Sequence, residues 1–217
     1  MTDLPVLDAV EQRVLGCLLE KQVTVPTTYP LTLNALRTAC NQTSSRDPVM
    51  DLDVRAVETT ARALRDRGLL RVVWADSGRR ILKYHQRLDE ALELAADERA
   101  LVTVLLLRGA QAPGELRSRT ERLHPFADRD VVDACLHRLS GRPSPLVRQL
   151  ERRPGQQDHR WVHLLGPVPE PAAGSSADEP AVDRERPSPT VPRPVTSGSA
   201  APTRRSPGTT PRRSPRS

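Results

Sequence analysis

The segment "DVRAVETTARALRDRGLLRVVWADSGRRILKYHQR", residues 53–87, begins with a helical pattern and changes abruptly into two strand patterns. Its helical part ends at Gly68, a residue type that often terminates helices. The apolar residues recur at helical spacing and are predicted to face inward: Val54, Val57, Ala61 and Leu64. Two apolar, β-branched runs then flank the turn-like stretch "DSGRR". The segment therefore predicts a helix followed by a β-hairpin.

Two further helices are predicted before this segment. Asp8 with Glu11 has the spacing of a capping box, and Thr32 can cap a second helix that runs to Cys40. The predicted buried stripe of that second helix is Leu33, Leu36 and Cys40. Either Asp51 or Asp53 then opens the third helix. Three helices and a hairpin are the element order of a winged-helix domain, which we predict for residues 1–90.

Residues 91–166 repeat this order. Asp97 precedes an apolar helix that stops at Gly109, and Pro113 suits the first turn of a short helix. A third helix, "RDVVDACLHRLS", has these predicted buried residues: Val131, Val132, Cys135, Leu136 and Leu139. The stretches "SPLVRQLE" and "HRWVHLL" predict a closing hairpin. The fold class expected is α+β, with two tandem winged-helix domains.

Residues 167–217 differ in composition from the rest of the chain. The stretch from Gly166 onward holds 12 of the 21 prolines, among Ser, Ala, Thr and Arg, which predicts a disordered basic tail. Seven arginines and no acid follow Glu185, so the net charge of +6 leaves −1 for residues 1–185. Any affinity of the folded part for nucleic acid must therefore come from the arrangement of its charges.

Two stretches resemble a known family. "GCLLEKQVTVPTTYPLTLNALRTACNQTSSRDPVM", residues 16–50, and "LLLRGAQAPGELRSR", residues 105–119, are similar to the YceH-like family of bacterial proteins. The resemblance covers roughly residues 8–165 and implies a tandem winged-helix fold, without implying a biochemical activity. The family tends to have Thr before "PGEL", where this chain has Ala112, so we expect that helix to lack a side-chain cap, at about 1 kcal/mol.

The residues offer no catalytic or metal site. Cys40 beside Asn41 could suggest a nucleophile, but no histidine is assigned to it, and it falls on an apolar stripe. His159 and His163 alternate along a predicted strand, with no cysteine near to complete a zinc site. We expect no enzyme activity and no cofactor. The N-terminus lacks a signal-peptide pattern and "LVTVLLL" is too short to span a bilayer, which predicts a cytoplasmic protein without membrane partners.

The helix of residues 53–67 is the candidate DNA-binding element. Residues on its outward side and at the hairpin tip form the predicted DNA site: Arg55, Thr59, Arg62, Arg65, Arg79 and Arg80. The equivalent helix of a helix-turn-helix enters the major groove, where arginine suits guanine edges and phosphates. The alternative is that Glu58 pairs with Arg62 four residues later, as in an ordinary solvated helix face.

Two functions follow from these patterns. The first is a DNA-binding protein, similar to a transcriptional regulator or a nucleoid-associated protein, with double-stranded DNA as partner. The second is a protein-interaction scaffold, which an apolar groove at the same surface would favour. Asp130 and Asp133 make the second domain unsuited to phosphates, so we expect protein contacts or a homodimer there. Both tryptophans, Trp74 and Trp161, are predicted to pack against helices, which argues against base stacking with RNA.

Overall fold

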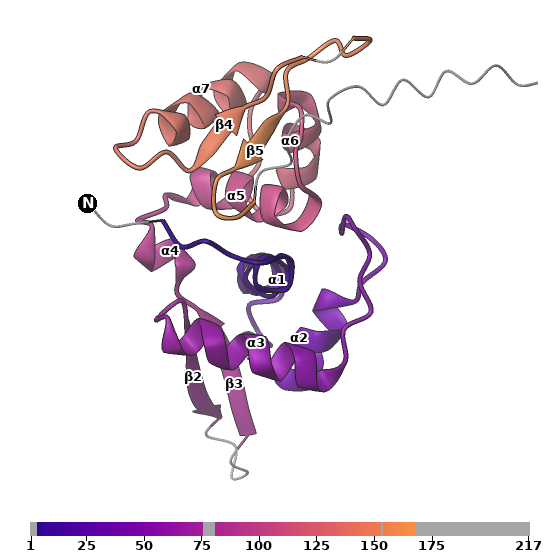
Figure 1. The fold of residues 1–217 in the computed structure, drawn as a ribbon, viewed down its shortest axis with the longest axis vertical. Coiled ribbons are helices and arrows are strands. Elements are labelled where there is room, and N and C mark those ends of the chain that lie inside the picture. Colours follow the sequence, from indigo (N-terminus) through magenta and orange to yellow (C-terminus); the bar gives the residue numbers. More distant parts are fainter. Residues whose placement is uncertain (1–3, 76–80, 153, 168–217) are drawn as a thin grey trace, which may run out of the picture. The chain divides into compact units, whose positions relative to one another are not determined.

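The computed structural model describes residues 4–75, 81–152 and 154–167 (Figure 1). Within these ranges the chain is α+β, with helices packed on two small antiparallel sheets. The described residues belong to one compact unit, Met1–Ala172. The predicted disordered tail, from residue 168 onward, and the predicted DNA contacts Arg79 and Arg80 lie outside the described residues.

The first half contains the predicted helices and hairpin together with one additional strand. Its elements are α1 (Ala9–Thr24), β1 (Leu31–Thr32), α2 (Leu33–Cys40), α3 (Val54–Asp66), β2 (Leu70–Ala75) and β3 (Ile81–Gln86). The predicted caps of α1 and α2 are confirmed: Asp8 accepts from the amides of Val10 and Glu11, and Thr32 accepts from that of Ala35. Of the two candidates for α3, Asp53 is the cap.

The three strands of the first half pair in the order β1-β3-β2. The long hairpin places Val72 opposite Tyr84 and Trp74 opposite Leu82. The two-residue β1 pairs with the outer side of β3, Leu31 opposite Tyr84. β1 was not predicted, because two residues are too few to form an alternating pattern.

The corner between α2 and α3 is held by polar side chains. The amide of Asn41 donates to the Leu52 carbonyl at 2.9 Å and its oxygen accepts from the Leu52 amide at 2.8 Å. Arg13 of α1 is buried and donates to the carbonyls of Cys40, at 2.9 Å, and Pro48. Arg46, also buried, pairs with Glu20 at 2.7 Å. The corner is therefore fixed to α1 through two buried guanidinium groups.

The second half repeats the arrangement with shorter strands. Its elements are α4 (Leu88–Ala91), α5 (Ala96–Arg108), α6 (Pro113–Thr120), α7 (Arg129–Ser140), β4 (Val147–Gln149) and β5 (Trp161–His163). Gln111, between α5 and α6, exchanges backbone hydrogen bonds with Trp161 at 3.0 and 2.8 Å. This bridge resembles β1 of the first half: β1 lies between α1 and α2, Gln111 lies between α5 and α6, and each pairs with the last strand of its half.

The starts of α5 and α6 lack side-chain caps. Asp97 was predicted to precede α5, but the N-cap is Ala95 and Asp97 lies inside the first turn, so that prediction is wrong. Ala95 has no side-chain cap, but its own backbone amide donates to the Glu98 carboxylate. For α6, the predicted absence of a cap at Ala112 is confirmed, and Glu115 accepts from the Ala112 amide at 2.9 Å. In both helices a glutamate of the first turn therefore accepts a hydrogen bond from the backbone amide of the N-cap residue.

α1 and α5 join the two halves through one hydrophobic core. In Figure 1, α1 is seen end-on between α3 and α5, and it contacts both helices. A Cβ atom on Gly16 would lie 2.8 Å from Cδ2 of Leu107, so the absence of a side chain there allows the close approach. Asp47, in the corner after α2, also donates its amide to the Leu107 carbonyl at 2.9 Å. The apolar run of α5 is buried all round because it packs on α1 and on the helices of its own half.

Three residues predicted to be buried are exposed. Val54 lies in the first turn of α3, where Leu52 from the preceding loop packs against the core. Val131 is 44% exposed, because the stripe of Val132, Cys135, Leu136 and Leu139 already covers the inward side of α7. Trp74 is 61% exposed, near the far end of the first hairpin. The exposure of Trp74 changes the functional interpretation.

Candidate interaction groove

The structure places the predicted DNA-contacting residues of α3 on its solvent side. Arg55, Thr59, Arg62 and Arg65 are all exposed, as the pattern predicted. Their arginines are not a purely basic row, because the helix also carries Glu58 and Asp66. Three arginines against two acids leave the helix one net positive charge.

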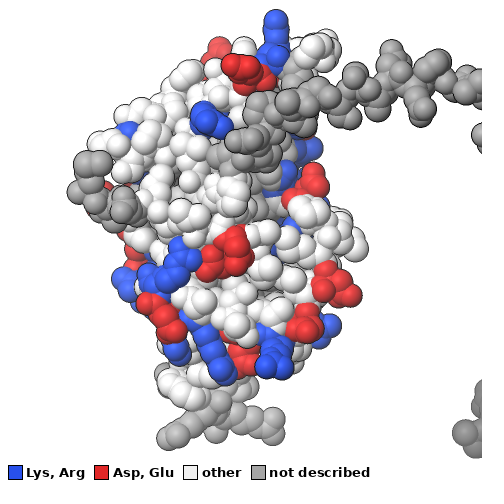
Figure 2. Space-filling model, viewed as in Figure 1, with Lys and Arg blue, Asp and Glu red and all other residues white. Residues whose placement is uncertain are grey.

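Two of these arginines form ion pairs within the helix. Arg62 lies 2.6 Å from Glu58 and Arg65 lies 2.7 Å from Asp66, measured between the closest side-chain nitrogen and oxygen atoms. All four side chains are exposed to solvent, so each pair contributes only about 0.2–0.5 kcal/mol. Figure 2 shows the same mixture across the face that carries α3, where basic and acidic side chains interleave. A continuous basic patch is absent among the described residues of that face.

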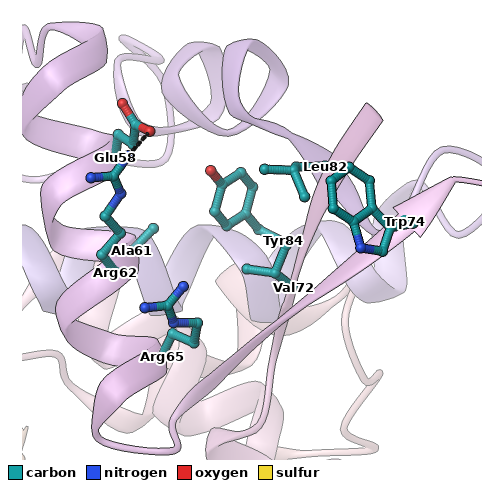
Figure 3. A pocket seen from close by; sticks show the side chains of 8 residues that line it. All are labelled: Glu58, Ala61, Arg62, Arg65, Val72, Trp74, Leu82 and Tyr84. Atoms are coloured by element: carbon teal, nitrogen blue, oxygen red, sulfur yellow. Dashed lines mark hydrogen bonds and ion pairs between the residues drawn. The ribbon is translucent and has the colours of Figure 1, made fainter. Parts of the chain in front are cut away.

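A groove of about 540 Å³ lies between α3 and the hairpin (Figure 3). The helix contributes Glu58, Ala61, Arg62 and Arg65 to its walls. The hairpin contributes Val72, Trp74, Leu82 and Tyr84, which strand alternation places on one face. Of the six predicted site residues, the groove therefore takes two, Arg62 and Arg65, while Arg55 and Thr59 do not line it.

Burial falls along the hairpin from its base to its tip. Leu70 and Tyr84 are buried, whereas Leu82 is 40% and Trp74 61% exposed. At the base of the hairpin, just after α3, Leu70 pairs with Gln86. Trp74 pairs with Leu82 near the other end of the two strands. At this end of the two strands, Trp74 and Leu82 have no partner within the described residues that would bury them.

The floor of the groove holds one polar group. In Figure 3 the Tyr84 hydroxyl points into the space between α3 and Leu82, and the Arg65 guanidinium lies toward the hairpin. Among the described residues, none forms a hydrogen bond with the Tyr84 hydroxyl. Burial raises the pKa of Tyr84, so at neutral pH the group is protonated and can donate a hydrogen bond.

The cysteines have structural environments. Cys17, Cys40 and Cys135 are free and buried, which confirms Cys40 as a core residue at the end of α2. The neighbouring Cys17 thiol and burial raise the pKa of Cys40, and burial raises that of Cys135 to about 12. A thiolate is the form of cysteine that attacks substrates, and these environments disfavour it at Cys40 and Cys135.

Other chemistry has little support in the part of the chain that is described. There, three or more His, Cys, Asp or Glu side chains do not converge anywhere in a way that could hold a metal ion. Burial lowers the pKa of His163 to about 4, so that imidazole is neutral at pH 7. Helices in the described ranges are also too short or too polar to cross a membrane.

Comparison with known proteins places the chain in a family. The model of the family "Protein of unknown function, DUF480" matches residues 7–156, which include the whole groove. Among curated proteins, the UPF0502 protein YceH of Salmonella paratyphi A and that of Salmonella newport are each 49% identical over 179 residues. Each alignment covers 80% of this chain and 83% of the relative. The chain therefore belongs to the DUF480 family, as the two motifs indicated.

Proposed function

We propose that the two halves are tandem winged-helix units and that the first binds a protein partner in the groove between α3 and its hairpin. The fold assignment is supported by the order of elements in each half. β1 and the Gln111 bridge strengthen it, because in both halves a short extended segment after the first helix pairs with the final strand. The role is that of an interaction protein without catalysis, which is supported by the buried thiols and by the groove between α3 and the hairpin.

The exposed Trp74 carries the functional proposal. Tryptophan is enriched at protein interfaces and in the residues that contribute most to binding energy. Here it stands beside Leu82 above an apolar floor, and α3 forms the opposite wall (Figure 3). The arrangement suits a peptide or helix that inserts apolar side chains into a groove. Burial of the exposed faces of Trp74 and Leu82 would supply the hydrophobic stabilisation.

Double-stranded DNA is the second candidate. The observation in its favour is that Arg55, Thr59, Arg62 and Arg65 all face solvent on the helix that follows the corner. Against it, phosphates would approach Glu58 and Asp66, which already hold two of the arginines. The ion pairs and the exposed Trp74 beside the groove make the protein partner the better-supported choice.

Affinity capture with the full chain tests the choice. The baits are the wild type, Trp74→Ser, and the control Ile81→Ser, which changes an exposed apolar residue whose side chain lies on the other face of β3. Each sample is split, one part is treated with nuclease, and bound proteins and bound DNA are both identified. We expect that the wild type and Ile81→Ser both retain the same bound proteins and that Trp74→Ser loses them. Nuclease treatment should not release these proteins. Recovery of DNA with equal yields from all three baits would instead support the second candidate.

A further inference from the structure

We infer that the groove recognises a short segment in which a bulky apolar side chain stands beside a carboxylate. The inference rests on the proposed protein-binding function and specifies the chemistry of its partner. It follows from three features of the groove: an apolar floor, an arginine that can change partners, and a hydroxyl that has no hydrogen bond among the described residues.

The apolar floor requires the bulky side chain. Val72, Leu82 and Ala61 surround the Tyr84 ring, and Trp74 projects beside them. The volume of about 540 Å³ falls within the range of about 300–1,000 Å³ typical of pockets that bury most of a small ligand. A leucine or an aromatic side chain inserted there would cover the exposed face of Leu82 and one side of Trp74.

The two arginines of the groove differ in how firmly they are held. Arg62 pairs with Glu58 one helical turn away, and both residues line the groove. Arg65 pairs with Asp66, its sequence neighbour, which does not line the groove and is more exposed than Glu58. Release of Asp66 gives up little stabilisation because that pair is solvated, and a carboxylate inside the groove would be less screened by water. Arg65 is therefore the cation available to a partner.

Tyr84 adds a polar group at the end of the groove where Glu58 and Arg62 lie (Figure 3). Its hydroxyl is protonated at neutral pH and, among the described residues, has no hydrogen bond. A carboxylate can pair with Arg65, whereas a lysine or arginine of a partner would meet two guanidinium groups, Arg62 and Arg65, and only one acid, Glu58, which is already paired. The charge complementarity of the groove thus favours an acidic partner over a basic one.

A nucleic acid fits these features less well. Its phosphates are spaced regularly along a strand, so a strand following α3 would pass Glu58 as well as Arg65. The aliphatic floor of Val72 and Leu82 also provides few groups that read base edges. A peptide needs one carboxylate at one position, which is what the groove offers.

The test begins with a phage-displayed library of random 12-residue peptides selected on the full-length protein. Peptides lost on Trp74→Ser but retained on Ile81→Ser define groove ligands. We expect them to be enriched in Asp or Glu next to Leu, Phe or Trp. The most enriched peptide is then synthesised with a fluorescent label, and its dissociation constant is measured by anisotropy.

Charge reversal identifies the arginine. We expect Arg65→Glu to weaken the acidic peptide at least tenfold, and a peptide with its acid changed to arginine to regain binding to Arg65→Glu. Arg71→Glu, an exposed arginine on the opposite face of β2, should leave the dissociation constant within about twofold. Because both arginines are exposed, both variants should keep the wild-type melting temperature.

The outcomes separate this inference from the proposed function. Groove ligands without an acidic preference, or an unchanged constant for Arg65→Glu, would overturn the inference and leave protein binding intact. No Trp74-dependent peptide at all would count against both. A 20-base-pair duplex that displaces the peptide and loses affinity on Arg62→Glu would replace both with DNA recognition.

Discussion

The two hairpins carry one tryptophan each, and the two halves use them differently. Trp161 is 2% exposed, and its ring meets His137 of α7 edge-on with 5.2 Å between centroids. By its pairing with the bridge and with β4, Trp161 has the position of Tyr84 in the first half. With Leu139 aligned to Leu64, His137 aligns with Arg62. In the second half a ring contact therefore joins the third helix to the hairpin, whereas in the first half Arg62 pairs with Glu58 and both line a groove.

This difference shows that one arrangement of elements can either pack a ring between the third helix and the hairpin or leave a groove there. The two halves differ in one residue of the third helix. His137 meets the ring of Trp161 in the second half, whereas Arg62 pairs with Glu58 of its own helix in the first. Four predictions test the comparison.

Removal of the two tryptophans should have very different effects on stability. Trp161→Ala deletes a fully buried ring and should lower the free energy of unfolding by about 3–5 kcal/mol. Trp74→Ala deletes an exposed ring and should change it by no more than about 0.5 kcal/mol. Urea unfolding of the two full-length variants gives both values. Similar losses would mean that Trp74 also supports the fold.

Acid should destabilise the protein through His163, the last residue of β5 in the second half. Burial lowers the pKa of His163 to about 4, while the unfolded chain titrates near 6.5, so the unfolded state takes up the proton first. The stabilisation is complete above pH 6.5 and is lost as the pH falls toward 4, by up to about 3 kcal/mol. His163→Leu should flatten this part of a stability-against-pH curve.

The control for this experiment is His159→Leu, because His159 is exposed just before the same strand. It should keep the wild-type slope. If His163→Leu titrates like the wild type between pH 6.5 and 4, the acid sensitivity belongs to other groups, the carboxylates first among them.

The contact between α1 and α5 should not tolerate a side chain at residue 16. A Cβ at Gly16 would lie 2.8 and 2.9 Å from Cδ2 and Cγ of Leu107, so Gly16→Val should lower the free energy of unfolding by about 1–3 kcal/mol. Gly114→Ala is the control, because a Cβ there meets nothing within 4 Å, and it should be neutral or stabilising by up to about 1 kcal/mol. Equal stability of Gly16→Val and the wild type would show that the two halves can move apart at little cost.

The ion pair beside the groove should have the smallest effect. Glu58→Gln removes the partner of an exposed arginine and should cost less than about 0.5 kcal/mol in chemical unfolding. Glu20→Gln is the contrasting variant, since it strips the carboxylate from Arg46, whose side chain is fully buried, and should cost several times more. A large loss for Glu58→Gln would mean that the first half depends on this pair to hold its helix.

The sequence predicted the helices well because their ends carry local signals. Asp8 with Glu11, Thr32 and Asp53 each bind backbone amides a few residues away, so their chemistry is visible in a short window. Burial was mispredicted at Val131, because the inward side of α7 was already filled by its neighbours, and at Trp74, because its burial depends on how far the helix extends along the hairpin. The DNA site was predicted from the outward side of the third helix together with arginines at the hairpin tip. That pattern identified Arg62 and Arg65 as exposed, but the groove they border depends on a hairpin face contributed by later residues.

The contact between α1 and α5 has a consequence during protein synthesis. α1 is complete when Thr24 has been made, but the helix that covers its Gly16 side ends at Arg108, 84 residues later. At about 5–20 residues per second the ribosome needs roughly 4–17 seconds to make that interval. Throughout this time the nascent first half leaves the α5-facing side of α1 uncovered. Newly made chains should therefore be substrates for ribosome-associated chaperones until α5 emerges and docks.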